Sequence, residues 1–139
     1  MAMRALLAYL AIATTFIASP VEAIDVCSGP NRAERKLTCL YDGDTGWENG
    51  VKWRLKDVDT PEYNGACGFE RETAKDAFYR MRELMAAGYK VEWLHEKAHD
   101  GERELVAIRL RDGRNAGIVL VEEDLAVAWP HRAGAWCKP

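Results

Sequence analysis

The sequence predicts a single α+β domain, a small β-barrel of five strands with helices packed on it. Three observations support this class. Apolar and polar residues alternate over residues 51–56, which is typical of a half-buried strand. Apolar residues recur three and four positions apart from Glu70 to Met85, which is typical of an amphipathic helix. The predicted order is strand, strand, helix, strand, strand, short helix, and one more short strand would complete a barrel of the OB type.

Residues 1–23 predict a secretory signal peptide that is not part of the fold. Arg4 precedes an apolar run over residues 5–18, and small residues follow near position 23, as at a cleavage site. The run is short for a membrane span, although an uncleaved anchor is the alternative. We therefore expect an exported protein, periplasmic or secreted, with residues 24–139 forming one domain.

The first predicted strand covers residues 36–41. Residues 42–50 are rich in Gly, Asp and Asn and predict a turn or hairpin tip. In the next strand, residues 51–56, Arg54 lies on the face opposite the apolar side chains. The extended segment that continues from this strand is expected to end at Thr60-Pro61, because proline cannot donate to a strand ladder.

The predicted helix begins near Glu70, and Gly88 is well placed just after its C-terminus. Strands are expected over residues 89–96 and 105–110. Asn115 is expected to cap a short helix that runs to about Val121. The apolar stripe of the long helix consists of Ala74, Ala77, Phe78, Met81, Leu84 and Met85.

The formal net charge is −3, which argues against a strongly basic surface for tight passive binding to DNA. The four cysteines form an even set in a short exported chain, and this predicts two disulfides. Three pairings are open, and we favour Cys27–Cys39 with Cys67–Cys137. A zinc site is the weaker alternative, because the spacings lack a C-x-x-C pair.

Three carboxylates and one arginine in a short stretch predict chemistry on a phosphodiester. Asp44 and Asp59 offer oxygen ligands to a hard divalent cation. Arg54 offers paired donors and positive charge to a phosphate. Glu62 can hold or deprotonate a water molecule.

These residues resemble those of the staphylococcal nuclease (thermonuclease) family. The resemblance covers about residues 37–128 and implies an OB-fold nuclease that uses Ca²⁺. Such an enzyme cuts DNA and RNA with little sequence preference and leaves a 5′-hydroxyl and a 3′-phosphate. The matching motifs are Asp42-Gly43-Asp44-Thr45, Arg54-Leu55, Val58-Asp59-Thr60-Pro61-Glu62, Arg103 with Leu105-Val106-Ala107-Ile108, and Asp112-Gly113 with Leu125-Ala126.

The resemblance also implies roles for single residues. Asp44 and Asp59 would bind Ca²⁺ through their carboxylates, and Thr60 would bind it through its carbonyl oxygen. Glu62 would position the attacking water and take its proton. These roles agree with the physical argument, since a metal places positive charge where the phosphate gains negative charge.

In the same way, Arg54 and Arg103 would clamp the phosphate. The chain departs from the family before Arg103, where the usual tyrosine is absent and Glu102 adds a negative charge. The aromatic residues that contact the base in the family have no clear match after position 126. Trp129 and His131 are the candidates to replace them.

Three function classes remain open from the sequence. The first is a Ca²⁺-dependent nuclease acting on DNA and RNA as a monomer. The second is a catalytically weak or silent OB module that binds nucleic acid or a protein partner in the cell envelope. The third is a structural protein of the envelope that keeps the fold for a partner surface.

Overall fold

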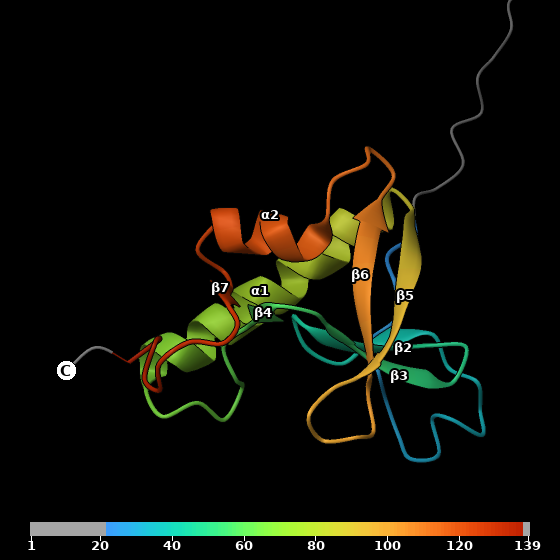
Figure 1. Cartoon of the computed structure of the whole chain (residues 1–139), viewed down its shortest axis with the longest axis horizontal. Coiled ribbons are helices and arrows are strands. Elements are labelled where there is room, and N and C mark those ends of the chain that lie inside the picture. The colour runs from blue at the N-terminus through green and yellow to red at the C-terminus, as the bar shows by residue number, and fades with distance from the viewer. Residues whose placement is uncertain (1–21, 138–139) are drawn as a thin grey trace, which may run out of the picture.

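The computed structural model describes residues 22–137 and shows an α+β chain with two helices, a five-stranded mixed sheet and a two-stranded sheet (Figure 1). All but the last two residues of the predicted signal peptide lie outside the described part. Within that part, no helix has both the length and the apolar character needed to cross a membrane.

The five-stranded sheet has the spatial order β1-β2-β3-β6-β5, and only the β3–β6 pair is parallel. Among the described residues, the outer strands β1 and β5 do not pair with each other. The expected closed barrel is therefore not observed, because the hydrogen-bonded ladder has two ends. The strands are β1 (Cys39–Leu40), β2 (Thr45–Glu48), β3 (Val51–Leu55), β5 (Tyr89–Lys97) and β6 (Glu104–Leu110).

Strand β2 occupies a stretch for which the sequence predicts a turn. Thr45 pairs with Arg54 and Glu48 pairs with Val51. The reversal itself needs only Asn49 and Gly50, whose φ angles of 46° and 82° are positive, as in the tight turns that match strand twist. Cross-strand pairing with β3 thus outweighs the local preference of a Gly- and Asp-rich segment for a turn.

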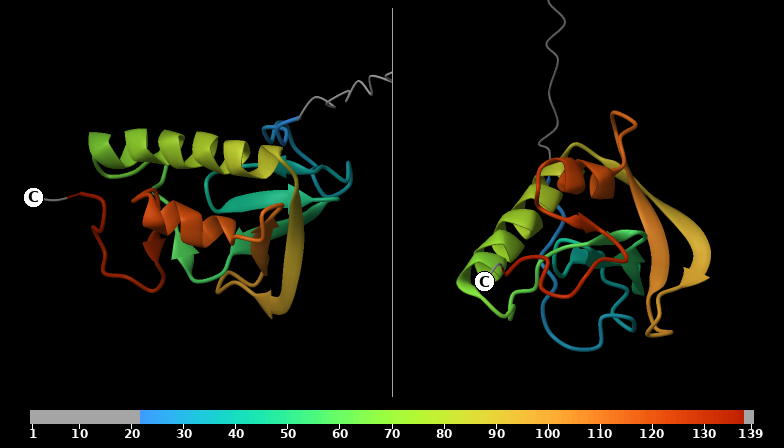
Figure 2. Two further views of the ribbon diagram at one scale, coloured as in Figure 1. Left: turned by 90° about the horizontal axis from the view of Figure 1, so that it is seen from above. Right: turned by 60° about the vertical axis from the view of Figure 1, so that its left-hand side comes forward.

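Both predicted helices are confirmed, as α1 (Gly68–Ala86) and α2 (Ala116–Glu122). Gly88 follows the end of α1 with a φ of 108°, and Asn115 caps α2 through its side-chain oxygen. The two helices lie side by side next to the sheet (Figure 2). Their buried faces join the strands in one core, which includes Leu40, Trp53, Leu55, Phe78, Met81, Val106, Ile108 and Leu120.

A second, two-stranded sheet joins distant parts of the chain. In it, β4 (Val58–Asp59) pairs antiparallel with β7 (Val127–Ala128). The backbone N–H of Trp129 adds a hydrogen bond to the carbonyl of Asp57, at 2.9 Å. The residues after β7 therefore pass close to Asp59, which the sequence offers as a metal ligand.

Both favoured disulfides are confirmed. Cys27–Cys39 ties the N-terminal lead-in to β1, with the Cα atoms 4.9 Å apart. Cys67–Cys137 ties the residue before α1 to the last described residue, with the Cα atoms 5.8 Å apart. Two disulfides fit an oxidising compartment outside the cytoplasm.

Candidate active site

The loop between β1 and β2 carries the first carboxylates of the site. A Cβ atom on Gly43 would lie 2.9 Å from Cγ2 of Thr60 and 3.1 Å from Cβ of Ala77, so glycine allows the loop to pack against α1. The same packing directs Asp44 inward, where its side chain is 3% exposed. The backbone N–H of Asp44 also donates to Oδ1 of Asp42, at 3.1 Å.

The buried carboxylate of Asp44 is fully engaged. Its Oδ1 accepts a hydrogen bond from the Thr45 hydroxyl at 2.8 Å. Its Oδ2 accepts the backbone N–H of Thr60 at 3.0 Å and pairs with Nη1 of Arg54 at 2.8 Å. Nη2 of Arg54 pairs with Oδ1 of Asp59 at 2.7 Å, so one guanidinium bridges both predicted metal ligands.

Arg54 is itself largely shielded from water, with 12% of its side chain exposed. Burial alone would lower its pKa, but the charge of Asp44 and the hydrogen bond to Asp59 raise the pKa above its ordinary value. The guanidinium therefore stays charged, and it neutralises part of the acidic cluster.

Glu62 and Arg103 line a pocket of about 330 Å³ next to this cluster. Glu62 is exposed, and in the described structure its carboxylate forms no hydrogen bond or ion pair. Nη1 of Arg103 donates to the Thr45 hydroxyl at 3.2 Å. The lining comprises Arg32, Tyr41, Asp42, Asp44, Thr45, Lys52, Glu62 and Arg103.

The altered turn before Arg103 still holds this arginine in place. Oδ2 of Asp100 pairs with Nε of Arg103 at 2.6 Å, and Oδ1 accepts the backbone N–H groups of Glu102 and Arg103. Burial opposes the ionised form, but these hydrogen bonds and the guanidinium lower the pKa of Asp100. Asp100 therefore orients Arg103, while Glu102 is exposed.

The acidic residues of the pocket repel one another. Burial, reinforced by the charges of Asp44 and Glu62, raises the pKa of Asp42 to about 8. Partial shielding of its carboxyl group within the pocket, with the charges of Asp44 and Asp59, also raises the pKa of Glu62. Such shifts mark negative charge that a bound cation would offset.

The chemistry of the donors fits a hard cation such as Ca²⁺, since carboxylates of Asp42, Asp44 and Glu62 line one pocket. Asp59 lies on the other side of Arg54. Arg54 contacts one oxygen of each carboxylate, so an ion bound by both Asp44 and Asp59 would share them with this guanidinium.

A different group has closely converging ligand atoms within residues 22–137, namely Cys67, Glu70 and Cys137. Its two sulfur atoms form the disulfide and so are not thiolate ligands. The weaker zinc alternative therefore has no support at these cysteines.

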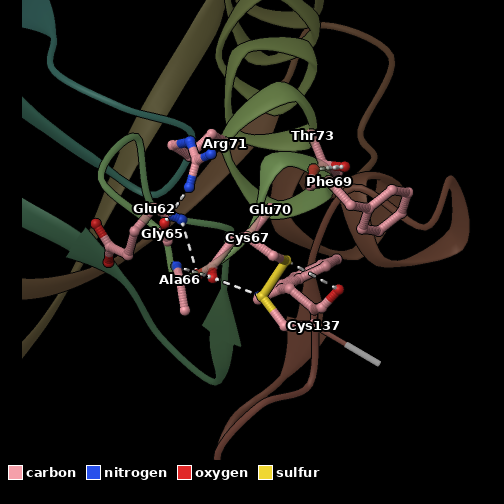
Figure 3. Close-up of a disulfide and its surroundings, with 10 residues drawn as sticks. Glu62, Gly65, Ala66, Cys67, Phe69, Glu70, Arg71, Thr73 and Cys137 are labelled. Atoms are coloured by element: carbon pink, nitrogen blue, oxygen red, sulfur yellow. Dashed lines mark hydrogen bonds between the residues drawn. A yellow bond between two sulfur atoms is a disulfide. The ribbon is translucent and has the colours of Figure 1, made fainter. Parts of the chain in front are cut away.

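The segment after Glu62 is fixed by the start of α1 (Figure 3). Oε2 of Glu70 accepts the N–H of Ala66 at 2.9 Å, and Nη1 of Arg71 donates to the carbonyl of Gly65 at 2.8 Å. The Glu62 side chain points away from the nearby disulfide in this view. The loop is thus anchored at its far end, while Glu62 faces the pocket.

His131 joins the site, although the sequence offers it only as a candidate base contact. Its Nε2 lies 2.7 Å from Oδ2 of Asp59, and its Nδ1 lies 2.8 Å from the carbonyl of Arg132. Both neighbours are acceptors, so this arrangement suits the doubly protonated ring. The hydrogen bond to Asp59 accordingly raises the pKa of His131. Trp129 packs edge-on against the ring, with centroids 5.3 Å apart.

The structure thus gathers the predicted residues into two adjoining groups. Asp44, Arg54, Asp59 and the Thr60 backbone form a buried cluster, and the pocket that Glu62 and Arg103 line opens beside it. No protein-family model matches this chain, and no curated protein matches it.

Proposed function

We propose that this protein is a Ca²⁺-dependent nuclease that hydrolyses the phosphodiester bonds of DNA and RNA. The observation that carries the proposal is the shared pocket of Asp44, Glu62 and Arg103, with Arg54 paired to Asp44 at its edge. Two guanidinium groups and several carboxylates within one small site suit phosphate binding, water activation and metal binding together. The likeness to the staphylococcal nuclease family, with its OB-type barrel, is part of the same proposal.

In this proposal Glu62 accepts a proton from a water molecule, and the water oxygen forms a bond to phosphorus. The bond from phosphorus to the 5′-oxygen breaks, and that oxygen takes up a proton from solvent. Arg54 and Arg103 donate hydrogen bonds to the non-bridging phosphate oxygens, which gain charge on the way. The products carry a 5′-hydroxyl and a 3′-phosphate.

Asp44 and Asp59, with the carbonyl oxygen of Thr60, are the proposed Ca²⁺ ligands, and Asp42 adds a further carboxylate nearby. When bound, the ion supplies positive charge close to the phosphate and offsets the repulsion that, in addition to burial, raises the pKa of Asp42. The two disulfides support a location outside the cytoplasm, and we propose a periplasmic or secreted monomer.

The test is digestion of heat-denatured DNA by the oxidised protein, with Ca²⁺ or with EGTA. We expect cleavage that needs Ca²⁺ and falls by about 10²-fold or more in Glu62→Gln and in Arg54→Ala. Glu72→Gln is the matched control, since Glu72 is exposed on α1 and does not line the pocket. Cleavage that persists in EGTA or in Glu62→Gln would refute the proposal.

One observation favours a second candidate, an OB-type module that binds nucleic acid without cutting it. All four carboxylate oxygens of Asp44 and Asp59 already accept hydrogen bonds from within the chain. A site satisfied in this way needs no metal to be stable. Intact oligonucleotide, bound equally well in Ca²⁺ and EGTA, would favour this candidate.

A further inference from the structure

Two cations of the pocket have no part in the proposed hydrolysis. Arg32 comes from the N-terminal lead-in that the Cys27–Cys39 disulfide holds, and Lys52 comes from β3. Neither side chain forms an ion pair in the part of the chain that the structure describes, whereas most other arginines there have a carboxylate or carbonyl partner. Arg32 lies over the ring of Tyr41 and Lys52 over the ring of Trp47, so each charge is held at the pocket without an anionic partner among the described residues.

Arg32 contributes to the wall of the pocket and carries one donor without a partner in residues 22–137. Its Nε atom is shielded from solvent but has no hydrogen-bond acceptor. A buried donor without a partner is destabilising, and charged donors cost more than neutral ones. The ring of Tyr41 holds the group from one side, with the guanidinium carbon 5.3 Å from the ring centroid.

Lys52 extends the phosphate clamp along β3. It lies two residues before Arg54, so both side chains leave the same face of the strand, roughly 7 Å apart along it. Neighbouring phosphates of an extended single strand are separated by a similar distance. When Arg54 and Arg103 hold one phosphate of a single-stranded nucleic acid, the next phosphate can therefore lie near Lys52 and Arg32.

We propose that Arg32 and Lys52 form a second phosphate subsite, which binds the phosphate next to the one that is cut. This inference rests on the proposed function and narrows its substrate class. The preferred substrates are single strands with at least two consecutive phosphates, rather than a lone phosphodiester. Arg32 supplies a forked donor pair and Lys52 a mobile point charge, and neither residue takes part in bond breaking.

The experiment measures binding of a fluorescently labelled oligothymidylate in EGTA, by fluorescence anisotropy at several salt concentrations. The logarithm of the binding constant falls as the logarithm of the salt concentration rises. Each phosphate contact that is lost on a single strand should make this slope less steep by about 0.7. We expect that change in Arg32→Gln and in Lys52→Gln, which keep most of each side-chain stem. Lys75→Gln is the matched control, because Lys75 is exposed on α1 and pairs with Glu72 outside the pocket.

The outcomes separate this subsite from the proposed function. An unchanged slope in both variants would overturn the subsite, and Ca²⁺-dependent cleavage by the wild type would still support the nuclease. Reduced slopes without any cleavage would support the subsite and count against the nuclease. No binding of the oligonucleotide by the wild type in EGTA would overturn the subsite, and Ca²⁺-dependent cleavage would still decide the nuclease. Equal loss in Lys75→Gln would show general charge attraction and would also overturn the subsite.

Discussion

Nε2 of His131 lies 2.7 Å from Oδ2 of Asp59, although 72 residues separate the two in the sequence. The contact depends on the pairing of β4 with β7, which carries the chain back past Asp59. A residue from the C-terminal segment thereby competes for a carboxylate that the proposed function assigns to Ca²⁺.

For His131→Gln we expect a loss of about 1 kcal/mol in the free energy of unfolding at pH 5.5. The hydrogen bond to Asp59 raises the pKa of His131, so its stabilisation is complete below the ordinary value of 6.5. It is lost as the pH rises through the raised pKa. Urea unfolding of the wild type and His131→Gln in EGTA, at pH 5.5 and pH 9, tests this. A stability difference between the two proteins that is equal at both pH values would contradict it.

Arg54→Ala should destabilise the protein in EGTA by about 3 kcal/mol, because it leaves the buried Asp44 charge unpaired. The side chain of Asp44 is 3% exposed in the intact protein, so water would replace only part of the lost ion pair. Added Ca²⁺ should recover part of the loss. Urea unfolding with and without Ca²⁺ measures both effects, and Arg54→Lys is the control that keeps the charge. A loss below about 1 kcal/mol would show that the bridge is weak.

Asp42→Asn should stabilise the protein at pH 8 in EGTA by about 1–3 kcal/mol. Burial and the charges of Asp44 and Glu62 raise the pKa of Asp42 to about 8, against 3.8 for an ordinary aspartate. The folded chain thus holds a proton that the unfolded chain has lost, and stability falls as the pH rises between these values. Asparagine removes this dependence and keeps an oxygen for the N–H of Asp44. Thermal melts of the wild type and Asp42→Asn at pH 5 and pH 8 test whether the stabilisation grows with pH. An equal change in melting temperature at both pH values would refute it.

Gly43→Ala should cost about 1–3 kcal/mol through overpacking. The added methyl group would lie 2.9 Å from Cγ2 of Thr60 and 3.1 Å from Cβ of Ala77. Gly68→Ala is the control, because its Cβ would meet nothing closer than 3.9 Å, at Nη2 of Arg71. Melting temperatures of the two variants provide the comparison, and an equal shift would argue against the close packing of this loop.

The sequence predicts the helices well because their signals are local. The apolar stripe of α1 and the capping side chain of Asn115 are both encoded within a few residues, and both are confirmed. The short strands are not encoded in this way. Thr45–Glu48 becomes a strand by pairing with β3 across the tight turn at Asn49-Gly50, although its composition indicates a turn. Val127–Ala128 becomes one only by pairing with the distant β4. Val51, expected on the buried side of its strand, is 43% exposed beside the hairpin turn.

For the candidate site, too, the sequence predicts what lies within one stretch and misses contacts that depend on the fold. Asp44, Arg54 and Asp59 lie within one short stretch, and their motif predicts that they act together. The ion pairs that now join them could not be foreseen, because the sequence assigns Asp44 and Asp59 to a metal. No local signal brings His131 to Asp59, because that contact depends on the pairing of β4 with β7. The contact of Asp100 with Arg103 is local, since Asp100 also accepts the N–H groups of Glu102 and Arg103 within one turn.

The Cys67–Cys137 disulfide has a consequence for limited proteolysis. Residues 99–102 form an exposed turn, and the bond links positions on either side of it. A single backbone cut there would divide the site, with Arg54 and Glu62 on one fragment and Arg103 and His131 on the other. The two fragments would stay joined by sulfur and would migrate as separate bands on a gel only after a reducing agent is added.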